Sequence, residues 1–168
     1  RQLISRTVRA GTPFLGICLG HQLATVALGG QVCTSDHFCL GAAEMHLTPE
    51  GKKDPLLSVY DGHRGIHFNN DVAVVLPEDA VLLARDPTGQ IEAVRFAERA
   101  WGVQFHPECT PEIFDAWTIG HGEKEWQQRL PWSEAVTVAE TVRRDIDTVN
   151  AEEAFAARFQ ELIDPEKR

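Results

Sequence analysis

The motif Gly16-x-Cys18-x-Gly20 constrains the fold of this chain more than any other part of its sequence. The apolar run at 13–17 predicts a short buried strand before the cysteine, and apolar residues at helical spacing over 19–27 predict a helix after it. A nucleophile between two glycines, at a sharp turn from strand to helix, is the elbow arrangement of G-x-S-x-G with sulfur in place of oxygen. Because such a turn is too tight for nearby Cβ atoms, we expect glycine to be required on both sides of Cys18.

Hydrophobic periodicity predicts an α/β fold for the rest of the chain. Apolar residues at helical spacing indicate a first helix that ends before Gly11. Short apolar runs separated by turn residues predict strands at 72–76, 81–84, 91–96 and 101–105. Such closely spaced strands are typical of antiparallel hairpins, and the residues after Pro111 are predicted to be helical to the end. We therefore expect one domain over residues 1–168, with a doubly wound, mostly parallel sheet, an antiparallel strand extension and C-terminal helices.

Composition argues against several classes of protein. Lys and Arg number 16 and Asp and Glu 25, and the resulting net charge of −9 is unfavourable for nucleic-acid binding. No apolar stretch approaches the ~18–20 residues of a membrane span, and no basic segment precedes an apolar one as in a secretory signal. Four cysteines in 168 residues are too few for a secreted disulfide framework. We expect a cytoplasmic enzyme with no nucleic-acid or membrane partner.

A second motif, WGVQFHPE at 101–108, contains the groups that a cysteine nucleophile needs. Such a nucleophile needs a base, and the base needs an acceptor that orients it. Pro107 restricts the residue before it to an extended conformation, so His106 and Glu108 can project to the same side. We predict that Glu108 holds one imidazole nitrogen of His106 while the other nitrogen faces Cys18.

The helix that follows Cys18 is expected to assist the same chemistry. Its first N–H groups have no partner within the helix and point toward a substrate, so the Leu19 N–H is predicted to stabilise an oxyanion. The positive end of the helix also favours the thiolate form of the cysteine over the thiol.

Together, the motifs GICLGHQ and WGVQFHPE resemble those of the class I glutamine amidotransferase family, and within it the glutaminase domain of GMP synthase. The resemblance runs from the first helix to His-Pro-Glu. It implies a flavodoxin-like fold and a Cys-His-Glu triad that hydrolyses the side-chain amide of glutamine through a thioester and releases ammonia. Carried over by position, Cys18 is the nucleophile, His106 the base and acid, and Glu108 the orienting carboxylate. Leu19 would then provide an oxyanion donor, and Gln22 would help to hold the substrate.

The sequence also departs from the family's pattern. The family's glycine-rich oxyanion loop and first strand are absent, and we expect both to precede Arg1 in the native protein. His67 and Asp71 lie where family members carry a histidine and an aspartate, and they are expected either near the substrate or in a solvated loop. No ATP-binding motif follows, so any ammonia is expected to reach a synthase or synthetase partner on another chain.

The predicted function is that of a glutaminase with glutamine as its small-molecule substrate. One alternative is a γ-glutamyl hydrolase or peptidase of the same superfamily, which would cut a γ-glutamyl bond. The other is a catalytically silent regulatory or binding protein. The complete triad counts against such a silent protein, whereas the missing oxyanion loop counts for it.

A metal site is a weaker hypothesis. Cys33, His37 and Cys39 form the pattern C-x3-H-x-C, to which His63 and His67 could add ligands. This spacing matches no standard structural zinc pattern. We therefore predict no metal and no cofactor, and interpret Cys33 as a strand residue and Cys39 as a loop thiol.

Overall fold

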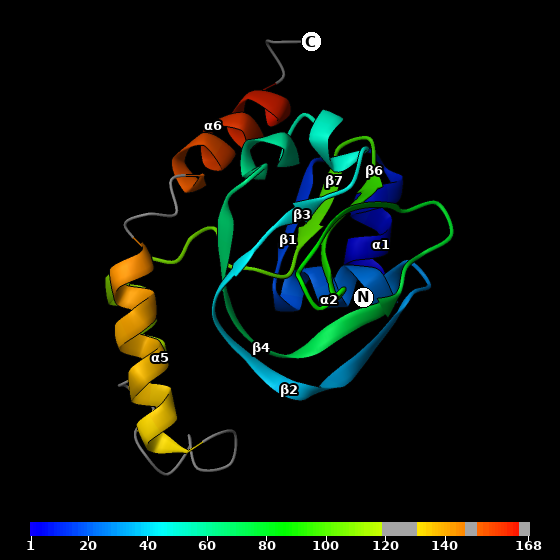
Figure 1. The fold of residues 1–168 in the computed structure, drawn as a ribbon. Coiled ribbons are helices and arrows are strands. Elements are labelled where there is room, and N and C mark those ends of the chain that lie inside the picture. Colours follow the sequence, from blue (N-terminus) through cyan, green and yellow to red (C-terminus); the bar gives the residue numbers. More distant parts are fainter. Residues whose placement is uncertain (119–130, 147–150, 165–168) are drawn as a thin grey trace.

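A five-stranded sheet forms the centre of the protein, as seen in a computed structural model that describes residues 1–118, 131–146 and 151–164 (Figure 1). The strand order is β1-β7-β6-β5-β3. These strands are β1 (Phe14–Ile17), β3 (His46–Leu47), β5 (Val81–Arg85), β6 (Ile91–Ala97) and β7 (Ala100–Val103). β1 pairs in parallel with β7, and the pairs β7–β6, β6–β5 and β5–β3 are antiparallel. The cysteine motif therefore follows the strand at one end of this sheet.

Helices cover both faces of the central sheet. α1 (Gln2–Arg9) and α2 (Leu19–Ala27) pack on one face, where Val8 and Ala24 join a buried cluster with strand residues of β6 and β7. On the other face lie α6 (Glu152–Ile163) and two short 3₁₀ helices, Gly51–Lys53 and Leu57–Tyr60. Each helix buries one apolar stripe against the sheet, which is why the helical periodicity was visible in the sequence.

A separate two-stranded sheet lies beside the central one (Figure 1). It consists of β2 (Gln31–Glu44) and β4 (Arg64–Val75), paired antiparallel with an irregular register between Thr34 and Cys39. α3 (Pro111–Thr118) and α5 (Trp132–Asp145) pack against it around a buried cluster formed by Ile66, Cys109, Phe114, Ala139 and Val142. This sheet brings residues near position 70 alongside the start of α2, where Gln22 bonds to Asp71.

The predicted α/β class, with helices on both faces, an antiparallel strand extension and C-terminal helices, is confirmed. Two details were wrong: of the strand predicted at 72–76, residues 72–75 end the long strand β4 rather than joining the central hairpins, and Cys39 lies within β2 rather than in a loop. The polar run at 67–71 is poor in strand-forming residues, and pairing with β2 overrides that local preference. The predicted helical stretch after Pro111 holds over α3, α5 and α6, while 119–130, 147–150 and 165–168 lie outside the described residues.

Across those described ranges, no helix is both long enough and apolar enough to cross a membrane.

Candidate active site

Cys18 occupies a strained backbone position between β1 and α2. Its φ is 46°, and among the described residues it alone has a positive φ without being a glycine. Its N–H donates to the carbonyl of Val103 on β7 at 2.8 Å, which anchors the turn to the sheet. Strain of this kind persists only where the surrounding structure enforces it, and it is concentrated at functional sites.

The steric requirement for glycine holds at one side of Cys18 but not at the other. A Cβ on Gly16 would lie only 2.6 Å from the carbonyl carbon of Gly20, so a side chain cannot fit there. A Cβ on Gly20 would meet no atom within 4 Å, so the predicted steric reason for this glycine was wrong. The bare backbone at Gly16 is what allows β1 to approach the first turn of α2.

A third glycine, Gly102, is equally constrained and was not singled out from the sequence. Its Cβ would lie 2.4 Å from Nδ1 of His21, whose ring is buried and stacks on Phe96. Burial lowers the pKa of His21 to about 4, so this ring is neutral at pH 7. His21 therefore belongs to the packing between α2 and the sheet although it stands in the same motif as Cys18.

His106 and Glu108 form the pair that their spacing predicted. Nδ1 of His106 donates to Oε1 of Glu108 at 2.7 Å. The backbone N–H of His106 donates to the carbonyl of Ile66 on β4 at 2.8 Å, and Trp117 of α3 packs against the imidazole with ring centroids 4.5 Å apart. The bond to Ile66 thus fixes the backbone of His106, while Glu108 and Trp117 fix the orientation of its ring.

Two opposing effects set the pKa of His106. Burial lowers it, but interactions with the neighbouring Cys18 and Glu108 outweigh burial and raise it to about 9. Nε2 is buried and has no hydrogen-bond partner among the described residues. The pairing of Nδ1 with Glu108 leaves Nε2 available for proton exchange with the cysteine.

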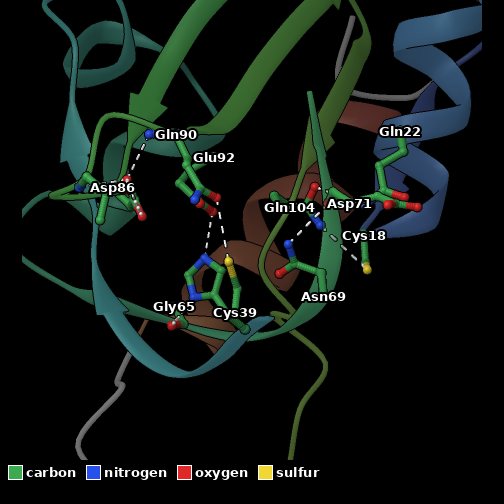
Figure 2. A network of polar contacts seen from close by, with 12 residues as sticks. Cys18, Gln22, Cys39, Gly65, Asn69, Asp71, Asp86, Gln90, Glu92 and Gln104 are labelled. Carbon is green, nitrogen blue, oxygen red and sulfur yellow. Dashed lines mark hydrogen bonds and ion pairs between the residues drawn. The ribbon is translucent and has the colours of Figure 1, made fainter. Parts of the chain in front are cut away.

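Two glutamines lie near Cys18, one in contact with its sulfur and the other bonded to the first (Figure 2). Nε2 of Gln104 donates to Sγ at 3.6 Å, and Gln104 is fully buried. Nε2 of Gln22 donates to Oε1 of Gln104 at 3.2 Å and to the backbone carbonyl of Asp71 at 2.7 Å. Gln104 was not predicted as a site residue, although it lies two residues before His106, a spacing that along an extended chain places both side chains on one face.

A cavity of about 260 Å³ opens beside the cysteine. Its lining consists of Cys18, Gln22, Phe38, Phe68, Asn69, Asn70 and Asp71. Leu19 is the first residue of α2, so its N–H belongs to the unpaired first turn of the helix, directly after the cysteine that lines the cavity. A thiol at the mouth of a small cavity with amide and carboxylate groups suits a small polar substrate.

His67 and Asp71, predicted together, are placed differently. Both lie in β4 rather than in a loop. Asp71 lines the cavity, and its carboxylate accepts a hydrogen bond from Thr34 at 2.8 Å. The ring of His67 does not line the cavity: it is buried, with Nε2 2.7 Å from Oε2 of Glu92 and Nδ1 3.1 Å from the carbonyl of Gly65. The structure therefore brings only Asp71 to the cysteine.

In the parts of the chain that the structure describes, no group of three or more His, Cys, Asp or Glu side chains could hold a metal ion. Cys33 is exposed on β2, and Cys39 bonds to Gln90. Cys109 is buried, and burial together with the charge of Glu108 raises the pKa of its thiol to about 12.

Comparison with known proteins gives a consistent set of similarities. The family model Glutamine amidotransferase class-I matches residues 1–120. The chain is 37% identical over 115 residues to the glutamine-hydrolyzing GMP synthase of Marinobacter nauticus, covering 60% of this chain and 20% of that relative. It is 34% identical over 101 residues to one of the subunits of the glutamine-hydrolyzing GMP synthase of Methanothermobacter thermautotrophicus, covering 57% of this chain and 51% of that relative. The chain thus spans between a fifth and about half of these relatives' length.

Two solved structures share the fold. A glutamine amidotransferase from Thermotoga maritima superposes with a TM-score of 0.77 at 20% identity, covering 97% of this chain and 67% of that one. A glutamine amidotransferase from Methylobacillus flagellatus superposes with a TM-score of 0.78 at 23% identity, covering 97% and 68%. The chain thus resembles glutamine amidotransferases in the arrangement of its helices and strands as well as in its sequence motifs.

Proposed function

This chain belongs to the class I glutamine amidotransferase family, and from that premise we propose that it hydrolyses the side-chain amide of glutamine at Cys18 and releases ammonia. The observation that carries the proposal is the arrangement around His106. One ring nitrogen is held by Glu108 at 2.7 Å, and the other is buried without a partner on the side where Cys18 raises the pKa of the ring. A cysteine with such a base and an adjoining cavity is equipped for acyl transfer.

The proposed reaction begins with proton transfer from Cys18 to Nε2 of His106. The thiolate attacks the carboxamide carbon of glutamine, a C–S bond forms, and the tetrahedral oxyanion is held by the Leu19 N–H. His106 then gives its proton to the leaving nitrogen, the C–N bond breaks, and ammonia departs from a glutamyl thioester. Throughout these steps Glu108 stabilises the imidazolium.

Hydrolysis of the thioester reverses the roles. His106 takes a proton from a water molecule, the resulting hydroxide attacks the thioester carbon, and the C–S bond breaks to return Cys18 as a thiolate. The net reaction is glutamine plus water to glutamate plus ammonia. We assign the substrate to the cavity beside Cys18, where Asp71 offers a carboxylate to an ammonium group.

We further propose that a synthetase partner consumes the ammonia. One of the relatives is named as a subunit of GMP synthase, and such a name describes one component of an assembly. No phosphate-binding G-x-x-x-x-G-K-[ST] motif occurs in the sequence. The four cysteines are free thiols, which fits the reducing cytoplasm as the place of action.

The test combines turnover with labelling. The full-length protein should release ammonia from glutamine, and a glutamine-derived diazo-oxo electrophile should label Cys18 and stop turnover. Release of glutamate from γ-glutamyl peptides without activity on glutamine would favour the hydrolase alternative. Absence of both activities, with Cys18 unlabelled, would favour a catalytically silent protein and refute the proposal.

A further inference from the structure

The polar side chain of Gln104 contacts the sulfur of Cys18. It follows β7 and is fully buried. Its backbone N–H donates to the carbonyl of Glu92 on β6 at 2.8 Å, so its position is set by the central sheet. Its Nε2 lies 3.6 Å from Sγ of Cys18.

The hydrogen-bond network determines which end of the Gln104 amide faces the sulfur (Figure 2). The terminal group of Gln22 that contacts Gln104 also lies 2.7 Å from the backbone carbonyl oxygen of Asp71. A carbonyl oxygen only accepts, so this group of Gln22 is the NH₂ donor. Its contact on Gln104, at 3.2 Å, must then be the amide oxygen, and the NH₂ of Gln104 is left to face Cys18.

An N–H donor directed at sulfur favours the thiolate, because hydrogen bonds to the charged form stabilise that form. The titratable groups nearest Cys18 are His106, Glu108 bonded to that histidine on the loop after β7, and Asp71 on β4 at the same cavity. The ring of His21 on α2 is buried against Phe96 and neutral. Gln104 adds a donor that carries no charge and does not titrate.

We propose that Gln104 is a positioning residue that holds the Cys18 sulfur as a thiolate, with its amide locked in the donating orientation by Gln22 and the Asp71 carbonyl. The proposal rests on the function proposed above and adds a residue to it. It also gives Gln22 a second task besides the predicted contact with the substrate, because the amide nitrogen of Gln22 is already engaged.

The experiment measures the rate of Cys18 alkylation by iodoacetamide against pH in the full-length protein, with mass spectrometry to quantify the adduct on Cys18. Gln104→Met keeps the length of the side chain but removes the donor. We expect the pH of half-maximal alkylation to rise by about one unit, equivalent to about a tenfold smaller acid dissociation constant. Gln104→Glu keeps an oxygen for Gln22 and places a carboxylate near the sulfur, so its shift should be larger.

Gln90→Met is the matched control, because Gln90 lies the same 3.6 Å from a cysteine, Cys39, but not from Cys18. It should leave the Cys18 profile unchanged. A purely structural role for Gln104 would lower the alkylation rate at all pH values without moving the midpoint, and that result in either folded variant would overturn the proposal. If Gln104→Met does not fold, Gln104→Leu, which also lacks the donor and adds no charge, decides in its place.

The two proposals fail separately. A midpoint that stays in place while the wild type hydrolyses glutamine refutes the role of Gln104 and leaves the glutaminase intact. A midpoint that shifts in a protein without glutaminase activity supports the role of Gln104 and removes the proposed reaction.

Discussion

Two sets of Cys, His and Glu side chains within the described ranges can be compared, the proposed catalytic set and a second one. The first set is Cys18, His106 and Glu108, and the second is Cys39, His67 and Glu92. In both, a histidine nitrogen lies 2.7 Å from the glutamate, and in both the cysteine sulfur lies 3.6 Å from a glutamine side chain. Residue types and short distances therefore do not distinguish them.

The first difference lies in how the histidine nitrogens are used. In the second set both nitrogens of His67 have partners, the carbonyl of Gly65 and the carboxylate of Glu92, and both side chains are almost completely buried. In the first set Nε2 of His106 has no hydrogen-bond partner among the described residues. A base needs a free nitrogen, so the pair that is less completely bonded is the one suited to catalysis.

The second difference concerns the cysteines. Burial, followed by the charges of Glu92 and Asp86, raises the pKa of Cys39 and keeps it a thiol. Cys18 faces a donated amide N–H and lines the cavity, whereas Cys39 does not line it. Access to the cavity and a donated N–H thus distinguish Cys18, the proposed nucleophile, from the thiol of Cys39.

The largest expected difference in kcat is between variants of the two cysteines. Cys18→Ala should lower kcat for glutamine hydrolysis by about 10⁴-fold or more, since it removes the nucleophile. Cys39→Ala should leave kcat unchanged. Ammonia release in a coupled assay measures both, and loss of activity in Cys39→Ala alone would invert the comparison.

The histidines should separate activity from stability. His106→Ala should abolish turnover and cost about 1–3 kcal/mol of the free energy of unfolding near neutral pH, because it removes a ring that is stabilised in its charged form. His67→Ala should leave the turnover of the folded protein intact but cost about 3–5 kcal/mol of stability, because it strands the buried carboxyl of Glu92. Denaturant unfolding and activity are measured on the same samples, and full activity in His106→Ala would refute the triad.

The glutamates should show a smaller contrast. Glu108→Ala should retain residual activity that exceeds that of His106→Ala by about 10–100-fold, because Glu108 only orients and stabilises the ring. Glu92→Gln keeps a hydrogen-bonding partner for His67 and should not change kcat. Equal losses in the two glutamate variants would mean that the second set also acts in catalysis.

The smallest expected effect is on the pH dependence of stability. The pKa of His106 is raised from 6.5 to about 9, so this ring stabilises the folded state below pH 6.5 and loses that contribution as the pH rises through 9. The free energy of unfolding of the wild type should therefore fall by about 1–3 kcal/mol over this interval, and that of His106→Ala should fall less. If the free energy of unfolding falls equally with pH in the two proteins, His106 is not the source of the pH dependence.

Residue types and their spacing were enough to predict the features that depend on local geometry. Gly16 marks a backbone that touches Gly20, and the spacing of His106 and Glu108 predicted their pairing. The predicted extended conformation was wrong in detail, because residues 106–109 form a turn in which the Cys109 N–H donates to the His106 carbonyl at 3.2 Å. The helices around the sheet followed from the 3.6-residue spacing of apolar residues, because each buries one stripe. These features join neighbours in the chain, and their residue types suffice to predict them.

Which distant polar groups meet depends on the packing of the whole chain. Gln22 lies on α2, Asp71 in β4 and Gln104 directly after β7. Their hydrogen bonds require both the central sheet, which holds Gln104 beside Cys18, and the sheet of β2 and β4, which packs beside α2. The same pairing buried His67 against Glu92 and left Asp71 at the cavity. A shift of one residue in a strand moves every side chain to the opposite face, and such a register is set by contacts between segments far apart in the sequence.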